Sequence, residues 1–191
     1  MRIKCSHSLF LIVDLQKALL PVIDGSDQAV NEAIWLGSLA QTLDVPVWLT
    51  EQYPQGLGGT EPRLIEALPN ARLWQKSHFG AHDETDFAEA LAALERRQVV
   101  ICGTEAHICV MQTALSLLEA GYEVYWLVEA TASRRQDEAK LAMARVQAAG
   151  GVPVTADMVA YEWLERCDNE RFKQAHRQFL KKRSARPLRF V

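Results

Sequence analysis

The sequence lacks the features of exported, membrane-spanning and disulfide-stapled proteins. Its four cysteines, Cys5, Cys102, Cys109 and Cys167, show no C-x-x-C spacing and no regular framework, so no disulfide scaffold is expected. The apolar run over residues 9–13 is far shorter than the apolar core of a signal peptide. No stretch approaches the ~18 apolar residues of a membrane span. We therefore expect reduced thiols, a cytoplasmic location and no membrane partner.

An excess of charge of one sign is also missing. The chain has 21 Lys and Arg against 24 Asp and Glu, a net charge of −3, so nothing global favours nucleic acid or an anionic surface as a partner. One local exception is a basic cluster near the C-terminus, which predicts either a solvated tail or a subunit contact. Its members are Lys181, Lys182, Arg183, Arg186 and Arg189.

What the sequence does have is a regular alternation of short apolar runs and longer amphipathic stretches. The short runs predict buried parallel strands, at residues 9–13, 45–49, 72–74, 98–102, 123–128 and 152–154. The amphipathic stretches predict helices, at residues 27–43, 84–96 and 137–149. We expect Ser26 or Asp27 to cap the first of them, and Gly121 and Gly150 to lie at helix C-caps.

This alternation predicts an α/β fold, a single doubly wound, Rossmann-like domain with a six-stranded parallel sheet flanked by helices. A length of 191 residues and a hydrophobic content of 49% fit one domain over residues 1–191. From about residue 157 we expect two terminal helices and the basic tail. Their aromatic content exceeds what two helices need for packing, which favours a homo-oligomer.

Three candidate residues for chemistry follow predicted strands. Asp14 follows the first strand, Lys76 the third, and Cys109 lies in the turn GTEAHICV after the fourth. Each alone has an ordinary explanation, as a helix cap, a solvated charge or a small buried side chain. Ligands of doubly wound folds bind beyond the carboxyl ends of the strands, however, and that edge would hold all three residues.

The chemistry of these residues favours a nucleophilic thiol. A helix N-terminus and Lys76 are expected to lower the pKa of the Cys109 thiol from about 8.5. Asp14 would accept the thiol proton and later return it to a leaving group. Backbone N–H groups of the turn could hold an oxyanion. Cys102 lies within an apolar strand, where burial leaves a thiol inert.

These motifs resemble those of the isochorismatase-like cysteine hydrolases, most closely the isochorismatase domain-containing proteins and related bacterial hydrolases. The resemblance covers residues 8 to about 160 and rests on VDLQ with Asp14, the strand-end Lys76, TEQYPQGLGGTEP, GTEAHICVMQTAL with Cys109, and EATASR. It implies an Asp14–Lys76–Cys109 triad that hydrolyses C–N bonds through a thioester. It also implies a cis peptide, by position Thr104–Glu105, with the N–H groups of Glu105 and Cys109 as the oxyanion hole.

The sequence departs from the metal-dependent branch of that family. Nicotinamidases carry an Asp and histidines after the second strand, whereas this chain has Gln52 and Tyr53 there and no histidine. His78 and His82 follow the third strand without a third ligand. We therefore expect no metal and no cofactor. True isochorismatases cleave a vinyl ether without a cysteine, so Cys109 favours an amide-type substrate.

Six further residues are candidates for binding a small-molecule substrate: Leu19, Gln52, Tyr53, Phe79, His107 and Thr131. For Leu19 and Phe79 the alternative is core packing, and for His107 a hydrogen bond that satisfies the turn. The Glu105 side chain has no assigned role.

The leading functional prediction is an amidase-type hydrolase of a small carboxamide or related C–N substrate. Three alternatives remain at this point: a vinyl-ether hydrolase of the isochorismate type, a non-catalytic interaction protein that keeps the fold, and a thiol redox protein that pairs Cys102 with Cys109.

Overall fold

A six-stranded parallel sheet forms the centre of the molecule. The computed structural model describes residues 2–188, and the strand order is β3-β2-β1-β4-β5-β6. The strands are β1 (Ser8–Val13), β2 (Val47–Gln52), β3 (Arg72–Lys76), β4 (Gln98–Gly103), β5 (Glu123–Thr131) and β6 (Val152–Val154). The order runs outward in both directions from β1 and β4, so the topological switch point lies between those two strands. The predicted fold class is confirmed.

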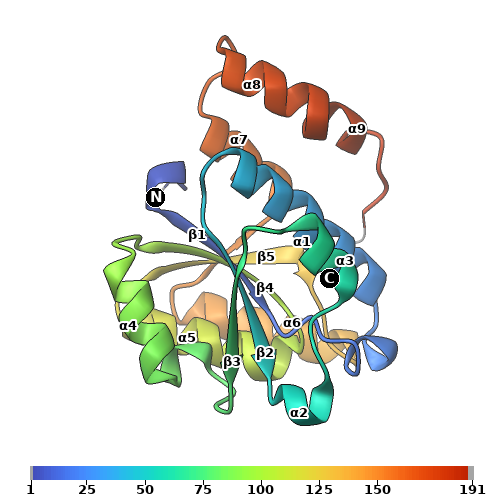
Figure 1. Cartoon of the computed structure of the whole chain (residues 1–191), viewed down its shortest axis with the longest axis vertical. Helices are drawn as coiled ribbons and strands as arrows, with labels where there is room; N and C mark the ends of the chain where they lie inside the picture. The colour runs from blue at the N-terminus through green and yellow to red at the C-terminus, as the bar shows by residue number, and fades with distance from the viewer. Residues whose placement is uncertain (1, 189–191) are drawn as a thin grey trace.

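Helices cover both faces of this sheet (Figure 1). They are α1 (Ser26–Thr42), α2 (Pro54–Leu57), α3 (Pro62–Ala67), α4 (Thr85–Ala93), α5 (Met111–Glu119), α6 (Gln136–Ala148), α7 (Ala156–Leu164), α8 (Glu170–Ala175) and α9 (Lys181–Arg183). Helices α1 and α7 pack on one face, and α4, α5 and α6 on the other. Within residues 2–188, no helix has the length and apolarity to cross a bilayer.

The alternation of side chains along β1 explains the two cores. Phe10 and Ile12 belong to the cluster on the α1 face, whereas Leu9, Leu11 and Val13 belong to the cluster on the α5 face. Successive side chains of a strand point to opposite faces, so a central strand between two helical layers must be apolar throughout. The observed β2, β3 and β5 extend past the predicted runs to Gln52, Lys76 and Thr131, because polar residues at the strand ends are buried by the loops above them.

The predicted cap of the first helix is wrong. Helix α1 begins after Gly25, which has a φ of 73° and forms no side-chain cap, and Asp27 instead lies 3.1 Å from Arg63. The left-handed conformation at that position favours glycine over Ser or Asp. Gly121 and Gly150, with φ of 82° and 108°, follow α5 and α6 as predicted for C-caps.

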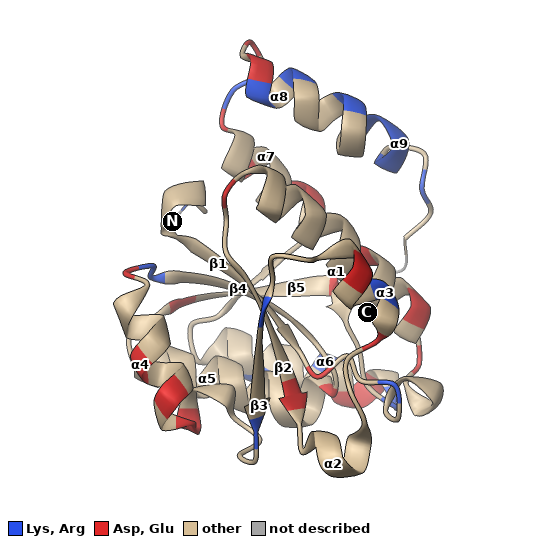
Figure 2. Ribbon diagram, viewed as in Figure 1, with Lys and Arg blue, Asp and Glu red and all other residues tan. Residues whose placement is uncertain are grey.

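The terminal segment forms two helical stretches, as predicted. The first is α7, and the second runs from α8 through a π-helical turn (His176–Leu180) to α9. This second stretch lies beside α7 and carries a row of basic residues (Figures 1 and 2). Trp163 and Leu164 are buried, Phe172 and Phe179 pack against the core, and Tyr161 is 53% exposed.

One member of the basic cluster departs from the predicted solvated tail. Arg183 is buried, and its guanidinium contacts Glu32, Glu129 at 3.0 Å and Asp157 at 2.9 Å. Arg186 adds a contact to Glu32 at 3.0 Å. The prediction fails here because the acidic partners lie far away in the sequence. Lys181 and Lys182 are exposed as expected, and Arg189 lies outside the described residues.

Arg183→Met is expected to lower the free energy of unfolding by about 3–5 kcal/mol, because it leaves buried carboxylates without their cation. Urea denaturation followed by circular dichroism measures the change. Lys182→Met, at the exposed neighbouring position, is the matched control and should stay within about 0.5 kcal/mol of the parent. Equal stability of the two variants would contradict a structural role for the buried ion pairs.

Candidate active site

Asp14 is held rigidly at the end of β1. It is fully buried, has a φ of 48°, and directly follows Val13, the partner of Thr50 in the sheet register. The Thr50 hydroxyl donates to Asp14 Oδ1 at 2.6 Å, and the Thr104 hydroxyl donates to the Asp14 carbonyl at 2.7 Å. Backbone and carboxylate are therefore both fixed by neighbouring strand ends.

Lys76 is the last residue of β3, and its side chain extends toward the Asp14 carboxylate. Its Nζ lies 2.8 Å from Asp14 Oδ2, and both side chains are buried. Nζ also donates to Gln52 Oε1 at 2.6 Å and to the Phe79 carbonyl at 3.0 Å. A buried ion pair is tolerated only when its remaining hydrogen-bonding capacity is satisfied, and these partners satisfy the ammonium.

Cys109 lies in a π-helical turn (Ala106–Val110) that leads into α5. The residue is 6% exposed. Burial and the charge of Asp14 raise the pKa of the Cys109 thiol to about 12, and the charge of Lys76 opposes this rise. The expected lowering of this pKa is therefore wrong, because desolvation and the nearby carboxylate outweigh the cation. At neutral pH the resting sulfur is a thiol, and its attack requires a base.

Gln52 joins the lysine to the cysteine. Its Oε1 accepts from Lys76 Nζ and, at 3.9 Å, from the Cys109 thiol. Its Nε2 donates to the Ser77 carbonyl at 2.8 Å, and its backbone N–H donates to Gln16 Oε1 at 2.7 Å. Predicted as a substrate-binding residue, Gln52 has both ends of its amide engaged within the site.

The turn before Cys109 passes very close to β1. Gly103 has a φ of 129°, and a Cβ there would lie 1.9 Å from the Val13 carbonyl oxygen, so only glycine fits. The peptide bond Thr104–Glu105 is cis, as the resemblance implies. The Glu105 N–H donates no hydrogen bond to the described residues, whereas the Glu105 carboxylate binds Arg134.

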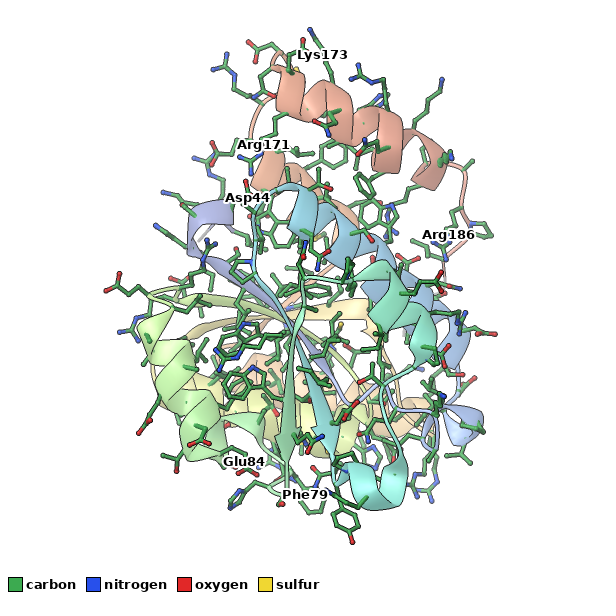
Figure 3. The ribbon with its side chains drawn as sticks, in the orientation of Figure 1. Asp44, Phe79, Glu84, Arg171, Lys173 and Arg186 are labelled. Atoms are coloured by element: carbon green, nitrogen blue, oxygen red, sulfur yellow. The ribbon has the colours of Figure 1, made fainter. Side chains whose placement is uncertain are left out.

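Three predicted substrate-binding residues lie toward the outside. Tyr53 and Phe79 are 58% and 52% exposed, and Phe79 lies beyond the carboxyl end of β3 (Figure 3). Core packing, the alternative for Phe79, is therefore excluded. Leu19 is half-buried in the turn before a 3-10 segment (Leu20–Val22), and its N–H donates to the Gln16 carbonyl at 3.0 Å.

The other two have hydrogen bonds of their own. His107 Nδ1 lies 2.9 Å from Ser133 Oγ, and its Nε2 lies 3.4 Å from Glu138 Oε2. The Thr131 hydroxyl donates to the Leu127 carbonyl at 2.7 Å. Thr131 and Ser133 line a pocket of about 420 Å³ between β5 and the starts of α1 and α6.

The two histidines after β3 do not meet at a common centre. His78 Nδ1 lies 3.0 Å from Glu84 Oε1, whereas His82 contacts the Tyr122 ring. Burial lowers the pKa of His82. Among residues 2–188, no group of three or more His, Cys, Asp or Glu could hold a metal ion.

Sequence reasoning missed several residues that support the site. Thr50 orients Asp14, and its place at the end of the second strand, within the TEQYP segment, was a usable signal. Arg134 and Ser133 lie in the EATASR segment, where the resemblance pointed to the motif but not to its contacts. The bond from Gln16 to Gln52 had no signal beyond its place in VDLQ.

Comparison with known proteins places this geometry in a family. The Isochorismatase domain matches residues 8–158. Isochorismatase domain-containing protein 2A of Mus musculus is 32% identical over 173 residues, which cover 91% of this chain and 82% of that protein. The structure of MAR1 ribonuclease from Caenorhabditis elegans matches with a TM-score of 0.88 at 29% identity, covering 100% of both chains.

A second solved structure is the YcaC gene product of Escherichia coli, described as an octameric hydrolase of unknown specificity. It matches with a TM-score of 0.84 at 25% identity and covers 96% of this chain and 97% of its own. The chain therefore belongs to the isochorismatase-like hydrolases, as the motifs predicted.

Proposed function

We propose that this protein is a cysteine hydrolase that cleaves the C–N bond of a small carboxamide through a thioester on Cys109. The observation that carries the proposal is the buried pair of Asp14 and Lys76, 2.8 Å apart, whose charges both act on the buried Cys109 thiol. A hydrolase that uses a protonated thiol needs a base beside it, and Asp14 is the carboxylate in that position.

In the first half of the reaction, Cys109 Sγ attacks the carbonyl carbon and its proton passes to Asp14. The carbonyl π electrons move to the oxygen, which the N–H groups of Glu105 and Cys109 stabilise. As the C–N bond breaks, Asp14 returns the proton to the nitrogen, and ammonia or an amine leaves. The acyl group remains on the sulfur as a thioester.

In the second half, water attacks the thioester and Asp14 takes the water proton. The C–S bond breaks, Cys109 regains a proton from Asp14, and a carboxylic acid leaves. Lys76, whose Nζ lies 2.8 Å from Asp14 Oδ2, lowers the cost of a transient thiolate on Cys109. The net reaction is amide plus water to acid plus ammonia or amine.

The redox alternative loses support from the position of Cys102. This residue belongs to the core cluster on the α1 face, whereas Cys109 belongs to the one on the α5 face, so the two side chains lie on opposite sides of the sheet. Burial raises the pKa of Cys102 well above its usual value. All four cysteines are free, which supports the proposed cytoplasmic location.

A panel of small amides, with ammonia release as the readout, tests the proposed function. Hydrolysis of at least one amide, unchanged by EDTA, is expected for a metal-independent thiol enzyme. A vinyl-ether substrate and a single-stranded RNA belong in the same panel, the latter because one structural neighbour is called a ribonuclease. Turnover of either of those substrates without any amide hydrolysis would overturn the proposal.

We also propose that the protein forms a homo-oligomer. Met158 and Tyr161 on α7 are each 53% exposed, and a structural neighbour is described as octameric. Burial of such apolar side chains against a second copy is favourable. Multi-angle light scattering at micromolar concentration should show a mass that is a multiple of 21.5 kDa, and a purely monomeric species would refute the proposal.

A further inference from the structure

The loop after β5 is joined to the turn that carries Cys109. The Ala132 N–H donates to the Gly103 carbonyl at 3.1 Å, and the Ala106 N–H donates back to the Ala132 carbonyl at 2.9 Å. These two bonds bracket Thr104 and Glu105. The segment between β5 and α6 therefore determines where the backbone before the nucleophile lies.

Arg134, in the same segment, also binds the side chain of Glu105. Its backbone N–H donates to Glu105 Oε2 at 3.1 Å, and its Nε donates to Oε2 at 2.9 Å and to Oε1 at 3.1 Å. A further bond runs from Nη2 to Oε1. A bidentate contact between a guanidinium and a carboxylate restricts the orientation of the carboxylate as well as its distance. The Glu105 carboxylate therefore accepts hydrogen bonds from both the main chain and the guanidinium of Arg134.

The burial of the two partners differs. Glu105 is 4% exposed, whereas the Arg134 side chain is 48% exposed. Burial raises the pKa of Glu105, but the hydrogen bonds and charge of Arg134 outweigh it, so the net pKa is lowered. Loss of Arg134 would leave a buried carboxylate without its cation, and Glu105 would have to move or take up a proton.

We propose that Arg134 is a positioning residue, which holds Glu105 so that its N–H points at the oxygen that gains charge during the reaction. This inference rests on the proposed hydrolase function. An oxyanion hole works because its donors are in place before the charge develops. The Glu105 N–H donates no bond to the described residues, and the Arg134 contacts fix the residue that carries it.

Arg134→Gln is therefore expected to lower kcat by about 10–100-fold, less than outright loss of a donor, and to leave KM within about twofold. Arg134→Lys, which keeps the positive charge but not the bidentate geometry of the guanidinium, should recover part of the lost kcat. Arg135→Gln is the matched control, because Arg135 is the exposed neighbour and pairs only with Glu138 among the described residues. It should match the parent.

Alkylation of Cys109 by two reagents tests the oxyanion hole without any substrate. When Cys109 adds to acrylamide, an S–C bond forms at the terminal carbon, the C=C pair shifts to the bond next to the carbonyl carbon, and the C=O π pair moves to the oxygen, which gives an enolate. The proton from sulfur then returns, through Asp14, to the carbon beside the carbonyl. With iodoacetamide, an S–C bond forms as iodide leaves with the C–I electrons, and the thiol proton passes through Asp14 to solvent. The carbonyl oxygen gains no charge in this reaction.

The ratio of the two alkylation rates, followed by intact-protein mass spectrometry, is thus the decisive measurement. Arg134→Gln should slow acrylamide about tenfold and iodoacetamide by less than about twofold. Equal slowing of both reagents, or of neither, would overturn the positioning role. If Arg134→Gln unfolds at a lower temperature than the parent, the same ratio of alkylation rates is measured on Arg134→Lys instead. Turnover of the vinyl ether or the RNA without any amide hydrolysis, together with a changed ratio of alkylation rates, would refute the proposed function and leave this inference standing.

Discussion

Cys109→Ala is expected to abolish hydrolysis, with a fall in kcat of about 10⁶-fold, the size seen when a covalent hydrolase loses its nucleophile. In the proposed mechanism the thiol acts in forming and breaking the thioester, so substrate binding should stay close to that of the parent. Cys109 is 6% exposed, its thiol donates a long hydrogen bond of 3.9 Å to Gln52 Oε1, and the substitution removes a single sulfur atom. The variant should therefore fold.

The measurement has two parts. Ammonia release gives turnover, and mass spectrometry of acid-quenched enzyme detects the acyl group as an added mass in the parent alone. Cys167→Ala is the control, because Cys167 is an exposed free thiol in the segment between α7 and α8. Turnover at the parent rate by Cys109→Ala would rule out the thioester and favour non-covalent cleavage, as in the vinyl-ether branch.

The edge of the sheet where the site lies could be predicted from the sequence, and the reason is topological. In a parallel sheet all strands end at the same edge, so Asp14, Lys76 and Cys109 needed only correct strand ends to be placed together. Apolar runs show where a strand is, and so β1 and β4 were found well. They do not show where a strand stops, and so the polar last residues Gln52, Lys76 and Thr131 were placed outside the predicted strands.

Long-range electrostatics could not be predicted in the same way. The basic cluster looked solvated because Glu32 and Glu129 lie about 50–150 residues away from Arg183 along the chain. The pKa of Cys109 was expected to fall because the motif shows a helix start and a lysine. Its rise follows from burial and from the distance to Asp14, quantities that exist only once the chain is folded.

Asp14→Asn separates the two roles proposed for the carboxylate at Cys109. Loss of the base should lower turnover by about 10²–10⁴-fold. The charge of Asp14 is also a cause of the raised thiol pKa, whereas Lys76 acts in the opposite direction. Removing that charge should bring the pKa of Cys109 below about 12. The variant is thus expected to be less active and to have a more acidic thiol.

The pH dependence of iodoacetamide alkylation measures this directly. At a pH below the pKa of Cys109, each unit by which that pKa falls raises the thiolate fraction tenfold. The thiolate also becomes less nucleophilic, so the alkylation rate rises by about threefold per unit. Lys76→Ala is the companion variant and should shift the profile the other way, toward higher pH. Asp14→Asn/Lys76→Met, which removes both charges, controls for the buried unpaired lysine left by the single change.

The sign of the two shifts distinguishes a catalytic pair from a structural one. If Asp14 and Lys76 only stabilised the fold, both single variants would lose stability while the thiol profile stayed in place. If Asp14 acted on the thiol but not as a base, the profile of Asp14→Asn would shift to lower pH with turnover preserved. Only a base beside a protonated thiol predicts a more reactive sulfur together with a slower enzyme, because acidity alone then does not supply the proton that the leaving nitrogen needs.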